Sequence, residues 1–148
     1  MTRTNTILLV EDNPADILLM QRAFRSDSLA NISLQIVRDG DAAVLYLNGE
    51  GEYSDRARYP LPTIILLDLK LPRRSGHEVL AWVKDQPKLK RLPVVVLTNS
   101  RQTLDLDRAY DLGVNSYLVK PVGFASLLEM IDTFNEYWLN YNEIPELI

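Results

Sequence analysis

The sequence contains no cysteine, and its only histidine is His77. Without a thiol the chain has no disulfide framework, no thiolate nucleophile and no cysteine-ligated metal site. A single imidazole also excludes a zinc site built from several histidines. Carboxylates, hydroxyls and amines are therefore the groups left for any chemistry.

The chain also has no excess of basic residues. It contains 16 lysines and arginines and 20 aspartates and glutamates, which gives a net charge of −4. This balance argues against a dedicated nucleic-acid binder. No apolar stretch approaches the roughly 20 residues that a membrane-spanning helix needs, and residues 1–6 lack the pattern of a signal peptide. We therefore expect a cytoplasmic protein that binds neither nucleic acid nor membrane.

Two patterns alternate along the 148 residues. Five short runs are rich in Val, Ile and Leu and alternate little between apolar and polar residues, which is typical of strands covered on both faces. These runs are Thr6–Val10, Ile32–Val37, Thr63–Leu67, Pro93–Leu97 and Ser116–Val119. The segments between and after them have helical spacing, and the length suits one domain. The alternation predicts an α/β fold with a central parallel sheet.

Polar residues directly follow four of these runs. Glu11 and Asp12 follow the first run, and Asp68 follows the third. Thr98 follows the fourth and Lys120 the fifth. Each alone has an ordinary structural explanation, such as a charge near a helix N-terminus or a surface lysine. Their position at the carboxyl ends of parallel strands, where such sheets bind ligands, favours a shared functional site.

The chemistry of these groups suits phosphoryl transfer. Neighbouring carboxylates raise one another's pKa values unless a cation lies among them, and Mg²⁺ is the simplest such cation. Asp68 is then free to act as a carboxylate nucleophile. Lys120 would pair with the transferred phosphoryl group, and Thr98 would donate a hydrogen bond to it.

Four motifs in this order resemble the receiver domain of bacterial response regulators. They are ILLVEDN at Ile7–Asn13, DLKLPRRSG at Asp68–Gly76, LTNS at Leu97–Ser100 and YLVKP at Tyr117–Pro121. The resemblance runs from about Thr6 to about Leu139. It implies a flavodoxin-like, doubly wound, five-stranded parallel sheet of order 2-1-3-4-5 with five helices. Residues 1–148 would then form a single receiver domain with a C-terminal helical extension at about 135–148.

The same resemblance assigns the metal ligands. Asp68 would be the phospho-acceptor and would also bind Mg²⁺ or another divalent cation in its place. Asp12 would be a direct ligand, and Glu11 would act through water. The backbone carbonyl of Lys70 would complete the protein's share of the metal site.

The resemblance also assigns the switch. Thr98 would be the switch hydroxyl, and Tyr117 would be the aromatic side chain whose rotamer reports phosphorylation. Lys120 would be catalytic, together with Asp68 and Thr98. A cis peptide bond between Lys120 and Pro121 is a further expectation, although cis bonds make up only about 5–6% of X–Pro bonds.

The expected partner is a sensor histidine kinase in a two-component phosphorelay. The segment after Lys120 is too short for a DNA-binding output module, so we expect a stand-alone receiver. The long loop Asn48–Pro62 is similar to that of the response regulators of cyanobacterial phytochromes. Aromatic and apolar residues beyond the last predicted helical stripe, Tyr137, Tyr141 and Ile144, predict a homodimer through this extension and the fourth-helix and fifth-strand face.

Two other functions compete with this interpretation. One is a phosphatase that forms an aspartyl phosphate, although Lys70 occupies the position where such enzymes generally carry a general acid. The other is a receiver-like module that binds partners without phosphorylation. We predict a switch that catalyses only its own phosphorylation and dephosphorylation, and no turnover of an external substrate. His77, Arg73 and Arg74 are interpreted as solvated surface residues.

Overall fold

A computed structural model describes residues 5–25 and 31–147, and a five-stranded parallel sheet forms its centre. The strands are β1 (Asn5–Val10), β2 (Ile32–Val37), β3 (Ile64–Leu67), β4 (Val94–Thr98) and β5 (Ser116–Val119). Their order is β2-β1-β3-β4-β5. The predicted fold class and strand order are therefore confirmed.

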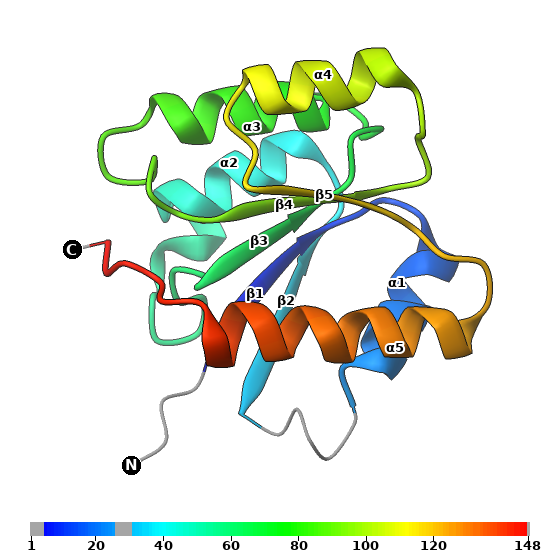
Figure 1. Ribbon diagram of the computed structural model, residues 1–148. Helices are drawn as coiled ribbons and strands as arrows, with labels where there is room; N and C mark the ends of the chain where they lie inside the picture. Colours follow the sequence, from blue (N-terminus) through cyan, green and yellow to red (C-terminus); the bar gives the residue numbers. More distant parts are fainter. Residues whose placement is uncertain (1–4, 26–30, 148) are drawn as a thin grey trace.

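Within the described residues, five α-helices cover the two faces of the sheet (Figure 1). They are α1 (Pro14–Ala23), α2 (Gly40–Asn48), α3 (Gly76–Asp85), α4 (Thr103–Asp111) and α5 (Phe124–Asn135). Helices α1 and α5 lie on one face, and α2, α3 and α4 lie on the other. A doubly wound sheet of this kind gathers the loops that carry chemistry at the carboxyl ends of its strands.

The central strands are buried on both faces, which explains their continuous apolar sequence. In β1, Ile7 and Leu9 belong to the core under α1 and α5, whereas Leu8 and Val10 belong to the core under α2, α3 and α4. All four residues of β3 are buried as well. With helices on both sides, no position of these strands faces water, so no alternation is visible in the sequence.

Local capping fixes where the helices next to the strand ends begin. The side chain of Asn13 accepts hydrogen bonds from the backbone N–H groups of Ala15 and Asp16, and Pro14 occupies the first helical position of α1. Ser75 and Glu78 form a reciprocal capping box at the start of α3. These caps hold the first turns of α1 and α3 directly beside the ends of β1 and β3.

The long loop after α2 has regular structure of its own. It contains a short 3-10 helix, η2 (Gly51–Ser54), and the rings of Tyr53 and Tyr59 lie 5.1 Å apart at their centroids and pack beside Tyr46. The guanidinium of Arg56 donates hydrogen bonds to the carbonyl oxygens of Tyr46, Leu47 and Tyr59. Arg56 thus supplies a donor to the carbonyl of Leu47 at the end of α2, and a second donor to the carbonyl of Tyr46, which also accepts from the N–H of Gly49.

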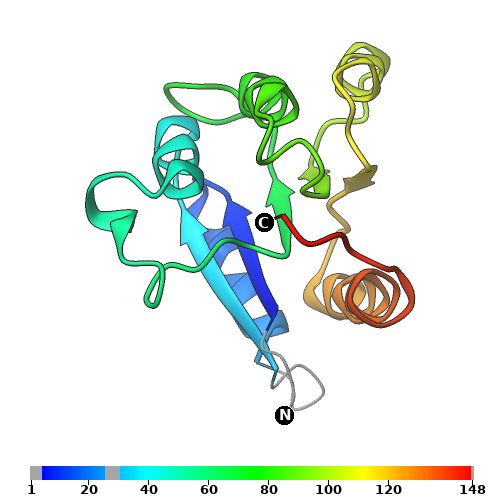
Figure 2. The same cartoon turned by 90° about the vertical axis from the view of Figure 1, so that its left-hand side faces the viewer.

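The C-terminal segment continues α5 and then returns to the sheet (Figure 2). A π-helix, η3 (Glu136–Tyr141), follows α5 directly. Trp138 packs against the core between α5 and the sheet, and Leu147 packs against the core on the opposite face. Tyr137 and Tyr141 remain 52% and 71% exposed. Part of this segment is therefore used within the chain, and two of its aromatic side chains face outward.

Candidate functional site

The carboxyl edge of the sheet brings three acidic residues together. Oxygen atoms from Glu11, Asp12 and Asp68 all lie within 4.8 Å of one another. The ladder places them there, since the backbone N–H of Asp68 donates to the carbonyl of Val10, the residue before Glu11. Glu11 is buried and Asp12 lies exposed at the rim. This oxygen-rich donor set fits a hard divalent cation.

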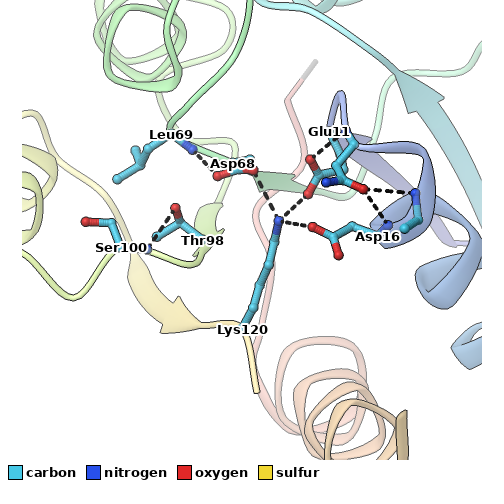
Figure 3. A network of polar contacts seen from close by, with 9 residues as sticks. Glu11, Asp16, Asp68, Leu69, Thr98, Ser100 and Lys120 are labelled. Atoms are coloured by element: carbon cyan, nitrogen blue, oxygen red, sulfur yellow. Dashed lines mark hydrogen bonds and ion pairs between the residues drawn. The ribbon is translucent and has the colours of Figure 1, made fainter. Parts of the chain in front are cut away.

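Lys120 reaches into the acidic cluster from the end of β5 (Figure 3). Its ammonium donates hydrogen bonds to Oε1 of Glu11, to Oδ2 of Asp16 at 2.8 Å and to Oδ2 of Asp68 at 3.2 Å. The backbone N–H of Lys120 donates to the carbonyl of Thr98 at 2.8 Å, which continues the β4–β5 ladder by one residue. The ammonium thus lies among three carboxylates in a largely enclosed position.

The charges in this cluster shift one another's protonation. Burial raises the pKa of Glu11 above its ordinary value, the hydrogen bond from Lys120 opposes this, and the nearby Asp68 raises the pKa further. Burial acts to lower the pKa of Lys120, but its hydrogen bonds to Asp16 and Glu11 outweigh that effect and raise it above the ordinary value. Lys120 is therefore a permanent cation at neutral pH.

Asp68 is held in place from both sides of its carboxylate. Its Oδ1 accepts a hydrogen bond of 2.7 Å from the backbone N–H of Leu69, and its Oδ2 accepts the bond from Lys120. Gly76 packs so closely that a Cβ there would lie 2.2 Å from the carbonyl oxygen of Asp68. The N–H of Gly76 also donates to the carbonyl of Leu69 at 2.8 Å. The β3–α3 loop thus folds back tightly on the residue that carries the carboxylate.

The same loop is tied to the start of α2. A Cβ at Gly40 would lie 1.9 Å from the carbonyl oxygen of Arg74, so only glycine fits there. Arg73 pairs with Asp39 at 3.8 Å, and Arg74 pairs with Asp41 at 3.4 Å. The side chain of Arg73 is 70% exposed, which agrees with its interpretation as a solvated loop residue, whereas that of Arg74 is 33% exposed and therefore partly covered.

A small cavity opens beside Asp68. It has a volume of about 260 Å³, and its lining comes from β3, β4 and the loops that follow them. The lining residues are Asp68, Lys70, Thr98, Asn99, Ser100, Arg101 and Gln102. Asn99 is exposed at this cavity, and the side chain of Lys70 also lies at the surface. A group attached to Asp68 would therefore have room on the side of Thr98.

Thr98 begins a chain of hydrogen bonds that leads to α4. Its buried hydroxyl accepts a bond of 3.4 Å from the backbone N–H of Ser100. The Ser100 hydroxyl donates to the carboxylate of Asp105 in the first turn of α4. The hydroxyl of Tyr117 donates to the carbonyl of Ser100 at 3.0 Å. Thr98 and Tyr117, which the sequence places on different strands, thus meet at one residue.

Comparison with known proteins decides the family. Residues 7–132 match the response regulator receiver domain. The chain belongs to the response regulator receiver family. No helix in the described part of this receiver is long and apolar enough to cross a membrane.

Three relatives illustrate the likeness. Response regulator Rcp1 from Synechocystis is 43% identical over 139 residues, which cover 94% of this receiver and 92% of Rcp1. The probable methanogenesis regulatory protein FilR2 from Methanothrix harundinacea is 44% identical, with 94% and 86% covered. The solved structure of the phosphorylated cyanobacterial phytochrome response regulator RcpA is 42% identical, covers 97% of this chain and 99% of RcpA, and superposes with a TM-score of 0.89.

Asp16 is a member of the site that sequence reasoning missed. It lies in the first turn of α1, four residues after Asp12, and its carboxylate binds Lys120. Asp12 lies before the N-cap residue Asn13 and outside α1, so helical spacing does not connect it to Asp16. The available local signal was an acidic residue in the first turn of the helix that follows β1. The acidic edge of this receiver therefore holds four carboxylates rather than three.

His77 is buried, so its interpretation as a solvated residue is wrong. Its Nε2 lies 3.1 Å from the carbonyl oxygen of Asp105, which joins the first turn of α3 to the first turn of α4. The partner lies 28 residues further along the chain, and no local pattern around His77 indicates it.

The expected cis bond between Lys120 and Pro121 is also wrong. Every peptide bond within residues 5–25 and 31–147 is trans. The trans form is the more stable one for X–Pro bonds, by about 0.5–1 kcal/mol. Lys120 reaches all three of its carboxylate partners from a trans bond.

Proposed function

We propose that this receiver accepts a phosphoryl group on Asp68 from the phosphohistidine of a sensor histidine kinase. The observation that carries the proposal is the position of the Asp68 carboxylate, between the Lys120 ammonium and an open cavity beside Thr98. The likeness to the phosphorylated RcpA structure supports it. Glu11 and Asp16 pair with the same ammonium, and Asp12 lies in the same acidic cluster. The site thus combines concentrated negative charge with a cation that balances part of it.

The transfer is a substitution at phosphorus. A carboxylate oxygen of Asp68 forms the new O–P bond while the N–P bond of the phosphohistidine breaks, and the imidazole leaves with the electron pair. Lys120 balances the charge on the phosphoryl oxygens. The hydrogen bond from Leu69 N–H holds the Asp68 carboxylate in a fixed orientation during this step. The proposal contains no turnover of an external substrate.

Glu11, Asp12, Asp68 and the backbone carbonyl of Lys70 are the proposed ligands of Mg²⁺. The cluster of three carboxylates fits such an ion, and the related Rcp1 has been solved in a Mn²⁺-bound form. When bound, the cation neutralises charge on the phosphoryl group. The exposed position of Asp12 lets an ion that keeps several waters reach the site from solvent.

Thr98 and Tyr117 are the proposed switch. In the present state the Thr98 hydroxyl is engaged with the N–H of Ser100. A phosphoryl oxygen on Asp68 would attract the Thr98 hydroxyl proton, and the β4–α4 loop would follow. Ser100 would carry that movement to Tyr117 through its carbonyl and to α4 through Asp105. The output is therefore a rearrangement of α4 and β5.

The proposed output surface is a homodimer interface on α4, β5 and the C-terminal extension. An open groove of about 440 Å³ lies over β5 and α5, with Leu118, Met130, Tyr137 and Trp138 in its lining. On α4, Leu104 and Tyr110 are exposed. Apolar side chains at the surface of three neighbouring elements suit a second copy of the chain. We place the protein in the cytoplasm, with a phytochrome-type histidine kinase as its donor, on the likeness to Rcp1 and RcpA.

The test is incubation with Mg²⁺ and acetyl phosphate, followed by intact-mass measurement of the wild type and of Asp68→Asn. A single phosphoryl adduct that decays slowly and is absent from the variant is the expected result. Continuous release of phosphate without an accumulating adduct would favour the phosphatase. The absence of an adduct, even with a cognate kinase, would favour the phosphorylation-independent module and refute the proposal.

A further inference from the structure

The carboxylate of Asp16 takes one of the three hydrogen-bonding protons of Lys120. We propose that Asp16 is a positioning residue that holds Lys120 before phosphorylation and yields it to the phosphoryl group afterwards. This inference rests on the proposed function. Asp16 lies outside the acidic triad of Glu11, Asp12 and Asp68. In this proposal it influences both the affinity of the site for the metal ion and its affinity for the phosphoryl group.

The first step is a count of donors. A lysine ammonium has three N–H bonds and no acceptor. In this receiver the three bonds of Lys120 go to three different carboxylates, those of Glu11, Asp16 and Asp68. None is left for a new partner. Before Lys120 can donate to a phosphoryl oxygen, one of the three carboxylates has to give up its bond.

Burial decides which carboxylate gives way. The side chain of Glu11 is 3% exposed, and it also accepts a bond from the backbone N–H of Asn13. Releasing Glu11 would leave a buried charge without its cation, which is costly. The side chain of Asp16 is 27% exposed, so water can replace the ammonium there. Asp68 is itself the acceptor and stays next to Lys120 when it carries the phosphoryl group. Of the two remaining partners, Asp16 is therefore the one that Lys120 leaves at lower cost.

The negative charge of Asp16 has opposite effects on the affinities of the site for Mg²⁺ and for a phosphoryl group. It attracts a divalent cation to the acidic edge, and it shares the positive charge of Lys120 with Glu11 and Asp68, the carboxylates that would bind the cation. It repels a phosphoryl group and competes with that group for Lys120. Removing the charge should therefore weaken Mg²⁺ binding and strengthen phosphoryl binding. Damage to the fold would weaken both.

The experiment compares the wild type with Asp16→Asn, which removes the charge at nearly constant shape. The matched control is Glu52→Gln, an equal change of charge in the exposed 3-10 helix η2, outside the acidic edge and the proposed dimer interface. Calorimetry measures the affinity for Mg²⁺ alone, and then the affinity for beryllofluoride, a phosphoryl analogue, at saturating Mg²⁺. A partly exposed ion pair is worth up to about 1 kcal/mol, so we expect changes of about fivefold or less.

The expected result for Asp16→Asn is a lower Mg²⁺ affinity and a higher beryllofluoride affinity, with neither change in the control. Asp16→Glu, which keeps the charge, should return both affinities toward the wild-type values. If both affinities fall, or neither moves, the role of Asp16 is refuted. If wild-type protein fails to bind beryllofluoride at all in the presence of Mg²⁺, the proposed function itself fails, and this result is distinct from the other two.

Discussion

The imidazole of His77 joins α3 to α4 through its Nε2, which lies 3.1 Å from the carbonyl oxygen of Asp105. Asp105 also accepts the hydroxyl bond of Ser100. The first turn of α4 is therefore bonded on one side to the loop after Thr98 and on the other to the helix after the Asp68 loop. Both loops that flank the proposed phosphoryl site converge on one residue of α4.

Replacing His77 tests this connection. His77→Phe keeps the buried volume roughly constant and removes the hydrogen bond to Asp105. We expect a loss of about 1 kcal/mol in the free energy of unfolding. Faster amide exchange in the first turn of α4 should accompany it, while the phosphoryl adduct on Asp68 still forms. Unchanged exchange in α4 would show that the bond does not restrain that helix.

Gly76 provides a test of the packing around the acceptor. Gly76→Ala would place a Cβ 2.2 Å from the carbonyl oxygen of Asp68, so the β3–α3 loop has to move. We expect destabilisation of more than about 2 kcal/mol and slower phosphorylation. The comparison variant is Gly51→Ala, where φ is +61° and a Cβ meets nothing within 4 Å. There the cost should be only about 1–2 kcal/mol of backbone strain, with phosphorylation unaffected. Equal effects at the two glycines would contradict the packing argument.

The buried Tyr46 predicts a loss of stability in alkaline solution. Burial raises its pKa from 10.0 to about 12. Between these values the unfolded chain releases the proton while the folded chain keeps it, so stability falls as pH rises from about 10 through about 12. The full loss is about 2–3 kcal/mol. Urea unfolding at a series of alkaline pH values measures it.

Tyr46→Phe is the control for that measurement. It removes the titrating hydroxyl together with its 2.8 Å bond to the carbonyl of Pro60. The variant should be less stable at neutral pH but should lose less stability between pH 10 and 12. An equally steep alkaline loss in the variant would assign the effect to other groups.

The exposed Tyr137 tests the homodimer. Tyr137→Glu places a charge in the groove over β5 and α5 and should shift the protein toward monomer in sedimentation experiments. Glu52→Lys, a charge change in the exposed 3-10 helix η2, serves as the control and should leave the association unchanged. A wild type that is monomeric at micromolar concentration, with and without phosphorylation, would rule out this interface.

The sequence predicts the sheet and the acidic edge well because both depend on local order. Apolar runs mark the buried strands, and residues that follow them lie at the carboxyl edge of any parallel sheet. Glu11, Asp12, Asp68 and Lys120 indeed lie together there. The family resemblance adds the strand order, which local patterns alone do not determine.

What the sequence does not predict depends on contacts between distant residues. The bond between His77 and Asp105 joins α3 to α4. Arg56, from the loop after α2, donates to the carbonyl of Leu47 at the end of that helix. The bond from Lys120 to Asp16 spans 104 residues. In each case the partner is chosen by how the elements pack, and the spacing of residues around either partner carries little information about the other.

The central claim is that Asp68 carries the phosphoryl group. Borohydride reduces an acyl phosphate on aspartate to the alcohol, which converts the residue to homoserine. Peptide mass mapping then locates the modified residue. After incubation with Mg²⁺ and acetyl phosphate, the account predicts homoserine at position 68 and at no other acidic position. Homoserine at position 12 or 16 instead, 5-hydroxynorvaline from a reduced glutamyl phosphate at position 11, or unmodified aspartate at position 68 in protein that carries a phosphoryl adduct, would contradict it.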